Sequence, residues 1–265
     1  MKCTTVITSY NRKNCIERAI DSSLRELPES EIIIVDDAST DGTISWIQDR
    51  YAHEISSGLI LIESLLENIG VTGAKNHGYV KAKGKWVIFL DSDDYYDSNV
   101  GKLILDDLES SAEQPIIFFR CRTETGAFIG SKKNGILEIE LRTYLKDGSY
   151  GEALTAFNKG MIGVLPPYIS ELRGYEGIGC AQIIKKYGPA RLSRVIARVY
   201  VLDGKDRISN GKLFITRMPL ISIGHMKMIK EFWREMSFSQ VLLLGGKSFF
   251  YLIIGQLFIQ LIKKK

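Results

Sequence analysis

Short apolar segments that alternate with helix-like patterns constrain the fold more than any other feature of this sequence. The four segments are β-branched and mostly apolar, which is typical of strands buried on both faces of a parallel sheet. They are Thr4–Ile7, Ile32–Val35, Leu59–Ile62 and Trp86–Leu90. Helical patterns lie between them over Asn14–Leu27, Gly42–Arg50 and Val71–Lys81. This alternation predicts right-handed βαβ units and an α/β fold, with a mostly parallel, Rossmann-like central sheet flanked by helices.

Two of these helical patterns carry start signals. Asn14 is followed three residues later by Glu17, which resembles a capping box with Asn in the place of Ser or Thr. Asp41 is placed to cap the helix over Gly42–Arg50.

The rhythm changes after about residue 111. Pro115–Phe119 and Arg194–Val201 resemble strands, and Gly177–Tyr187 resembles a helix. The 265 residues contain no internal repeat and no flexible linker, so we expect the halves 1–110 and 111–226 to pack as one body. Residues 227–265 form a third, basic and apolar segment.

Polar clusters follow each of the four predicted strands. They are Thr8–Arg12, Asp36–Asp41, Glu67–Gly70 and Asp91–Asp94. Ligands of open α/β sheets bind beyond the carboxyl ends of the strands, and these ends share one edge. Solvated turns would be divided between both edges, so the pattern favours a binding site over exposed loops.

The acids at this edge suit a hard cation. Mg²⁺ and Mn²⁺ take oxygen ligands, often one or two carboxylates plus substrate phosphates. Asp91-Ser92-Asp93 offers carboxylates in a tight turn, and Asp36-Asp37 could accept hydrogen bonds from a base and a ribose. A GxGxxG fingerprint is absent after the first strand, and Gly73–Gly78 lacks the Lys-Ser/Thr of a phosphate-binding loop.

These stretches resemble the inverting glycosyltransferases of family 2, which have the GT-A fold. The resemblance rests on "VITSYNR" (6–12), "IIIVDDASTDGT" (32–43) and "ENIGVTGAKNHGYVKAKGKWVIFLDSDD" (67–94), and more loosely on "LRGYEGIG" (172–179). It implies a nucleotide-sugar-binding half over 1–110 and an acceptor-binding half over 111–226. Cytoplasmic enzymes that extend O-antigen or capsule repeat units on a lipid carrier are similar to the whole chain.

The resemblance also implies roles for individual residues. Asp93, with Asp91 and Asp94, would bind Mn²⁺ or Mg²⁺. Thr8 and Tyr10 would line a uracil pocket, and Lys75 would face the diphosphate or ribose. The full nucleotide-sugar set is Thr8, Tyr10, Arg12, Asp36, Asp37, Asn68, Lys75, Asp91 and Arg207.

Glu176 is the predicted catalytic base, because it falls where the family has Glu-Asp at the head of a helix. Inversion needs a base that takes a proton from the acceptor hydroxyl. Here the second acid is replaced by Gly177, and the alternative role for Glu176 is a helix-start acid favoured by the dipole. Glu152 and Arg173 are the predicted acceptor contacts.

The C-terminal segment combines charge with apolar residues. Residues 227–265 contain seven Lys/Arg and two Glu, a net charge of +5, although the whole chain carries only +4. This pattern indicates an anionic membrane surface rather than nucleic acid. Val241–Ile262 contains one charge, Lys247, and is long enough to span a bilayer. Its basic flanks favour a helix in the membrane interface, with a spanning helix and a core helix as alternatives.

Cysteine usage and the N-terminus indicate the compartment. The four cysteines are scattered, and the N-terminus turns polar after seven residues, unlike a signal peptide. We therefore expect a cytoplasmic enzyme at the inner face of the membrane. It would move a hexose from a UDP-sugar to a saccharide on a polyprenyl diphosphate. A sugar-nucleotide nucleotidyltransferase and a non-catalytic nucleotide-sugar-binding protein are the alternatives.

Overall fold

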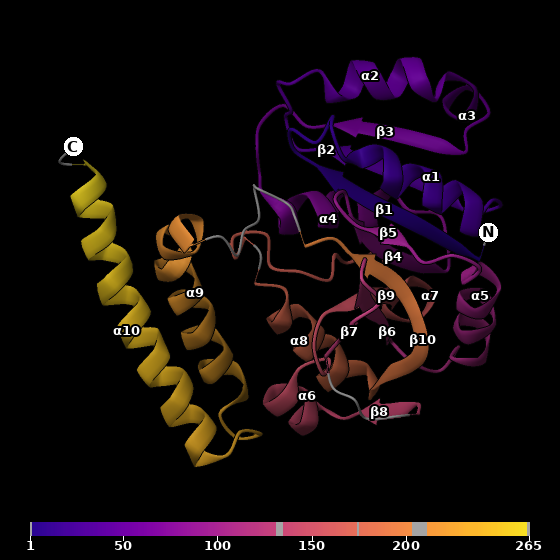
Figure 1. The fold of residues 1–265 in the computed structure, drawn as a ribbon. Coiled ribbons are helices and arrows are strands. Elements are labelled where there is room, and N and C mark those ends of the chain that lie inside the picture. The colour runs from indigo at the N-terminus through magenta and orange to yellow at the C-terminus, as the bar shows by residue number, and fades with distance from the viewer. Residues whose placement is uncertain (1, 131–134, 174, 203–210, 264–265) are drawn as a thin grey trace.

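The structure is a computed structural model that describes residues 2–130, 135–173, 175–202 and 211–263, with side chains left out at 211–213 and 258–263 (Figure 1). The elements are β1 (Cys3–Ser9), α1 (Ile16–Glu26), β2 (Glu31–Asp36), α2 (Thr43–Arg50), α3 (Ala52–Ser56), β3 (Ile60–Ser64), α4 (Val71–Lys81), β4 (Trp86–Asp91), β5 (Tyr95–Tyr96), α5 (Gly101–Ser110), β6 (Ile116–Thr123), β7 (Phe128–Ile129), β8 (Leu137–Ile139), α6 (Leu141–Asp147), β9 (Ala153–Asn158), α7 (Lys159–Ile162), α8 (Gly177–Tyr187), β10 (Ala190–Tyr200), α9 (Gly211–Phe232) and α10 (Phe238–Lys263).

One mixed sheet joins both halves of the chain. Its strand order is β3-β2-β1-β4-β9-β6-β10-β5. β1 to β4 are parallel, β9 runs antiparallel between β4 and β6, and β10 is parallel to β6. The predicted α/β fold with a Rossmann-like sheet flanked by helices is therefore confirmed, as are the four predicted strands and the helix over Gly177–Tyr187.

The predicted capping box is wrong. Helix α1 begins at Ile16, and its N-cap is Cys15, which makes no side-chain capping bond. The N-cap of α2 is Gly42 rather than the predicted Asp41, although the Asp41 Oδ1 accepts from the Thr43 backbone N–H at 3.0 Å.

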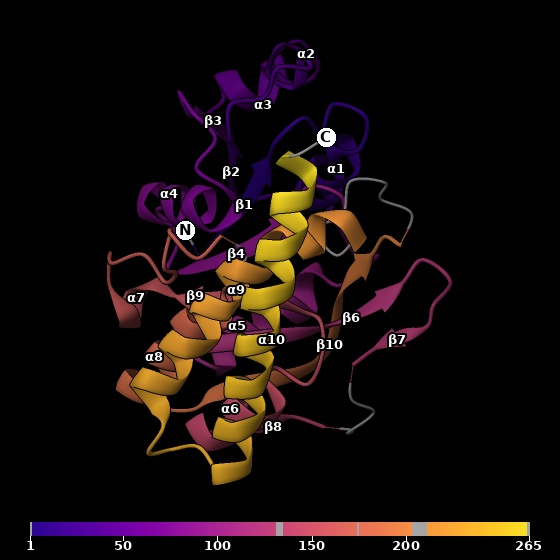
Figure 2. The same ribbon diagram turned by 90° about the vertical axis from the view of Figure 1, so that its left-hand side faces the viewer.

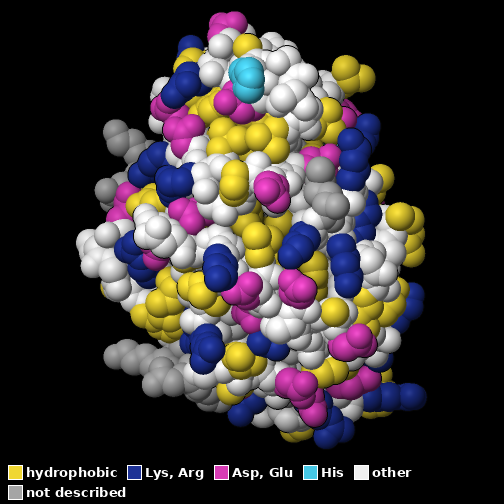
Figure 3. Space-filling model, turned by 90° about the vertical axis from the view of Figure 1, so that its right-hand side faces the viewer, with side chains coloured by type: hydrophobic (Ala, Val, Ile, Leu, Met, Phe, Trp, Pro, Cys, Tyr) yellow, Lys and Arg dark blue, Asp and Glu magenta, His cyan; other side chains and the backbone are white. Residues whose placement is uncertain are grey.

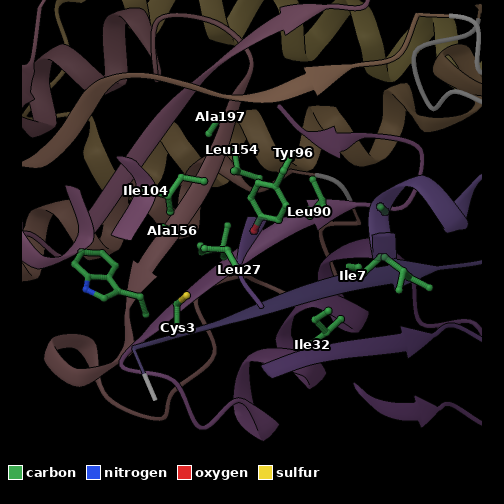
Figure 4. Close-up of a cluster of buried hydrophobic side chains, with 14 of the residues drawn as sticks. Cys3, Ile7, Leu27, Ile32, Leu90, Tyr96, Ile104, Leu154, Ala156 and Ala197 are labelled. Carbon is green, nitrogen blue, oxygen red and sulfur yellow. The ribbon is translucent and has the colours of Figure 1, made fainter. Parts of the chain in front are cut away.

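Side chains alternate across the sheet and fill two cores. Cys3, Ile7 and Leu90 point to the face covered by α1 and α5, where Figure 4 shows them with Tyr96. Residues one position away point to the opposite face, among them Val6, which lies against Gly78 of α4 in a second buried cluster that also includes side chains of α8. This period of two is the geometry of an extended strand, and both faces are apolar because helices cover both.

A glycine and a buried acid fix the entry to α5. The Glu26 carboxylate accepts from the backbone N–H groups of Val100 and Gly101 at 2.9 and 3.1 Å. A Cβ at Gly101 would lie 1.8 Å from the Glu26 carbonyl oxygen, so no larger residue fits this close approach.

The C-terminal helices α9 and α10 pair as an antiparallel hairpin at one side of the sheet domain, here called the α9–α10 hairpin (Figure 2). Ser222 and Ser248 join the two helices, since each hydroxyl donates to the other's carbonyl oxygen, at 2.8 and 2.9 Å. Helix α9 begins well before residue 227, where the basic segment was expected to start. The predicted apolar tail helix is confirmed as α10, and only 11 % of its apolar stretch within Phe238–Leu257 is buried. By length and composition this helix could cross a membrane, and its exposure disfavours a core helix.

Candidate functional site

The polar clusters meet at the carboxyl edge of the sheet. In the parallel registers, Thr8 at the end of β1 pairs with Asp91 at the end of β4. Ser9 pairs with Asp36 at the end of β2. The sequence-based expectation that these clusters share one edge is therefore confirmed.

Asp37 organises the loop that leads into α4. Its Oδ1 and Oδ2 accept from the backbone N–H groups of Ile69 and Gly70 at 2.7 and 2.9 Å. The amide of Asn68 donates to the Asp37 carbonyl at 3.2 Å. Burial raises the pKa of the Asp37 carboxyl above its ordinary value, although these two N–H groups act against it. Its predicted contact with a base stays a prediction.

Asp36 ties the loop after β2 to the loop after β1. Its carboxylate accepts from the backbone N–H and the hydroxyl of Ser39, at 2.9 and 2.5 Å. The Ser39 hydroxyl in turn accepts from the Asn11 backbone N–H at 2.8 Å. Tyr10, the first residue of the loop after β1, is 47 % exposed and so is accessible to a ligand. Thr8 is nearly buried at the end of β1.

Arg12 lies in the same loop. Its backbone N–H donates to the Thr43 hydroxyl at 3.1 Å, which holds the loop against the start of α2. Its predicted nucleotide contact stays a prediction.

A chain of ion pairs connects five separate segments at this edge. Lys75 of α4 lies 3.0 Å from Asp91 and 2.8 Å from Glu176. Arg198 of β10 lies 3.1 Å from Asp91. The same guanidinium lies 3.2 Å from Asp94 and 3.4 Å from Glu152. Both cations are buried, so they and the acids must satisfy one another.

The ion pairs shift the pKa values of the acids and of Lys75 in this network. Burial acts to raise the pKa of Asp91, but Lys75 and Arg198 bring it below its ordinary value. Burial likewise raises the pKa of Asp94, which reaches about 7 because Arg198 offsets only part of that effect. Burial acts to lower the pKa of Lys75, yet Asp91 and Glu176 raise it, which keeps the ammonium charged.

The residues of the predicted metal site fit a cation held mainly by one protein carboxylate. Asp91 and Asp94 are engaged with Arg198, whereas Asp93 has no ion pair or hydrogen bond among the described residues. The described residues also contain no group of three or more His, Cys, Asp or Glu placed to hold a metal. A hard cation bound by one or two carboxylates completes its shell with water and substrate phosphates, and Asp93 suits that arrangement.

Glu176 points its carboxylate into this network. It is the N-cap residue of α8, but its side chain makes no capping bond and pairs with Lys75 instead. A Cβ at the neighbouring Gly177 would lie 3.8 Å from the Tyr144 hydroxyl and 3.9 Å from the Met228 methyl. An acid at position 177 would therefore leave the backbone beside those two residues, whereas Glu176 reaches Lys75.

The remaining predicted residues lie around this centre. Arg173 donates to the Asn68 carbonyl at 2.8 Å and to its side-chain oxygen at 3.3 Å. Glu152 exposes 55 % of its side chain next to Arg198. Arg207 lies outside the described residues.

Arg198 is a site residue that sequence reasoning missed. It was assigned only to a predicted strand, although an arginine between Ala197 and Val199 is a charge in an apolar run. Such a charge is buried only when it is paired. Its position therefore signalled acidic partners, but not which acids they would be.

Comparison with known proteins agrees with this geometry. The sequence model described as "Glycosyl transferase family 2" matches residues 4–152, more than half of the chain. The chain is 39 % identical over 95 residues to an Escherichia coli protein named UDP-Glc:alpha-D-GlcNAc-diphosphoundecaprenol beta-1,3-glucosyltransferase WfaP. This alignment covers 34 % of this chain and 35 % of that protein. For the first curated relatives that it matches, the chain spans between 16 and 35 % of their own length.

Solved structures share the fold at low sequence identity. Staphylococcus aureus TarS 1–349 in complex with UDP-GlcNAc aligns with a TM-score of 0.65 and 17 % identity, over 85 % of this chain and 67 % of that one. The mannosyltransferase PcManGT from Pyrobaculum calidifontis, in complex with GDP-Man and Mn²⁺, aligns with a TM-score of 0.64 and 16 % identity. That alignment covers 99 % of this chain and 75 % of the other.

Proposed function

Because the chain belongs to glycosyl transferase family 2, we propose that it transfers a hexose from a UDP-sugar to a saccharide carried on a polyprenyl diphosphate, with inversion. The observation that supports this most is the meeting of Glu176, Lys75 and Asp91 at the carboxyl edge of the sheet. The names of WfaP and of the TarS complex, which include UDP-Glc, a diphosphoundecaprenol acceptor and UDP-GlcNAc, support the substrate classes. UDP-glucose and UDP-galactose are the donors we favour.

The donor would lie across the ends of β1, β2 and β4. Thr8 and Tyr10 would face the uracil, with Asp36 and Asp37 near the base and ribose. Mn²⁺ or Mg²⁺ at Asp93, when bound, would neutralise the charge that the departing diphosphate develops. The Mn²⁺ named with PcManGT supports this cofactor class. Further donor contacts are proposed for Arg12, Asn68, Lys75, Asp91 and Arg207, and further metal contacts for Asp91 and Asp94.

Glu176 would act as the base for transfer. Its carboxylate takes the proton of the acceptor hydroxyl while the bond from that oxygen to the anomeric carbon forms. On the opposite face of the sugar the bond to the diphosphate breaks, and UDP leaves with the bonding electrons. Lys75 holds the carboxylate at the sheet edge, and Glu152 and Arg173 would contact the acceptor.

The α9–α10 hairpin would hold the enzyme at the inner face of the membrane. On α10 the exposed apolar side chains include Leu242, Leu243, Phe249, Phe250 and Leu257. The opposite side of the molecule mixes acidic, basic and apolar side chains over its whole surface (Figure 3). Holding an enzyme next to a lipid-borne acceptor raises the effective concentration of that acceptor.

A double substitution, Leu242→Asp with Phe249→Asp, should weaken binding to vesicles of phosphatidylcholine and phosphatidylglycerol at least tenfold. Each large apolar side chain is worth roughly 1.5–3 kcal/mol when it leaves water. Sedimentation with vesicles measures the effect, and Leu103→Asp on α5 is the matched control. Unchanged sedimentation of the double variant would show that this face does not meet the membrane.

Assays with a donor panel and a lipid-diphosphate sugar acceptor test the function itself. Release of UDP that requires both substrates supports transfer. Pyrophosphate release would instead indicate a nucleotidyltransferase, and binding without turnover a non-catalytic protein.

A further inference from the structure

Two arginines meet where the α9–α10 hairpin joins the predicted acceptor side of the site. The guanidinium of Arg217 in α9 donates to the carbonyl oxygen of Arg173 at 2.7 Å. The side chain of Arg173 lies over Gly70, where an added Cβ would be 2.8 Å from its Cδ. Three residues after Arg173 comes Glu176, the predicted base.

Neither arginine forms an ion pair among the described residues, and the one carboxylate that acts on Arg173 from nearby is that of Asp37, whose pKa the arginine acts to lower. Arg173 bonds only the oxygens of Asn68, and Arg217 bonds only a backbone carbonyl. Burial lowers the pKa of Arg217, and the charge of Arg173 lowers it further. The two guanidinium groups repel each other, and neither is neutralised by an ion pair, so an anion that binds between them relieves the repulsion.

The hairpin is fixed to this segment by packing. The ring of Tyr175 lies against Gly224, where an added Cβ would be 2.8 Å from the ring. The same ring packs edge-on against His225, with centroids 5.7 Å apart. Arg217 is therefore held against the loop that carries Arg173 and Glu176. It belongs to the α9–α10 hairpin, which also carries the exposed apolar side chains of α10.

We propose that Arg173 and Arg217 form a binding site for a diphosphate group, that of the lipid-linked acceptor. This inference rests on the proposed function, which supplies an acceptor with such a group. Guanidinium groups bind phosphate oxygens through two parallel hydrogen bonds, and a diphosphate offers oxygens to both arginines. A lipid held in the membrane by its prenyl chain would present its diphosphate beside the hairpin, with the sugar toward Glu176.

The test measures binding of farnesyl diphosphate and of UDP to the full chain by isothermal titration calorimetry, with farnesol as the apolar control. Arg217→Gln should weaken farnesyl diphosphate binding about tenfold or more, as expected when a charge-assisted contact is lost. UDP binding should stay unchanged. Lys227→Gln is the matched control, because it removes an exposed charge from the same helix about 15 Å further along the axis.

The outcomes separate the two possible sources of the diphosphate. Weaker UDP binding with unchanged farnesyl diphosphate binding would overturn the assignment to the acceptor and give the site to the donor. Unchanged binding of both, or equal loss in Lys227→Gln, would overturn the arginine site altogether. Arg173→Gln should reproduce the loss, and Arg217→Lys should retain part of the affinity because it keeps the charge without the planar fork.

This test is independent of turnover. Suppose that the wild-type chain binds farnesyl diphosphate without transferring sugar. If Arg217→Gln then weakens that binding, the proposed function fails and the diphosphate site stands. If transfer occurs, Arg217→Gln should raise the KM for a lipid-diphosphate acceptor and leave the KM for an acceptor without a diphosphate unchanged.

Discussion

Replacement of Asp93 by alanine should reduce sugar transfer by roughly a thousandfold or more, because the metal contributes several kcal/mol to stabilising the departing diphosphate. The substitution should not disturb the fold. Asp93 has no ion pair or hydrogen bond within the described residues, so its loss leaves no buried charge without a partner. The melting temperature should therefore change little while activity disappears. Chelation of divalent ions should reproduce the loss in the wild-type enzyme.

The comparison with other acids makes this result specific. Asp106→Ala removes an exposed acid from α5, on another part of the surface, and should keep full activity. Titration with UDP in the presence and absence of Mn²⁺ supplies a second measurement. The metal should strengthen UDP binding to the wild type but not to Asp93→Ala. Full activity of Asp93→Ala would remove the metal role from this residue.

Substitution of Glu176 by glutamine should lower kcat by about a hundredfold or more, the loss expected for a general base. Donor affinity should be unchanged, because the glutamine oxygen can still accept from Lys75 and the Lys75–Asp91 pair at 3.0 Å remains. Steady-state kinetics together with UDP titration measure the two effects separately. Glu171→Gln, an exposed acid in the same segment, is the control and should have wild-type kinetics.

Gly177 offers a sharper version of this experiment. The resemblance to family 2 predicts a second acid at this position, yet a Cβ at Gly177 would lie beside the Tyr144 hydroxyl and the Met228 methyl. Adding Gly177→Asp to Glu176→Gln should therefore not restore turnover. Restored activity in that double variant, or unchanged kcat in Glu176→Gln, would assign the base to another residue.

The fold could be predicted to a large extent because its signals are local. The runs that became β1, β2 and β4 are mostly apolar and buried on both faces, and α1 was recognisable from the periodicity of its apolar residues. The start of α1 was predicted incorrectly, since the chain enters the helix at Ile16 and leaves Asn14 outside it. Helix boundaries depend on how the preceding loop packs, which short patterns do not encode.

The candidate site was predicted in part. Asp91, Lys75 and Glu176 were each named from the sequence, and the structure brings them together. Arg198 was missed, although it contacts three of the acids. Arg217 was missed as well, because nothing in its local sequence distinguishes it from other basic residues near the C-terminus.

The sequence by itself determined the alternation of strands and helices over residues 4–90, the polar clusters at the strand ends and the apolar character of the last helix. Each of these follows from residues close together in the chain. Only the tertiary structure decided that Lys75 pairs with Glu176, 101 positions away, and that Arg198 pairs with Asp91, 107 positions away. Such contacts arise when distant segments are buried against one another. A buried charge must then find whatever opposite charge the packing brings near, and that partner cannot be read from either segment alone.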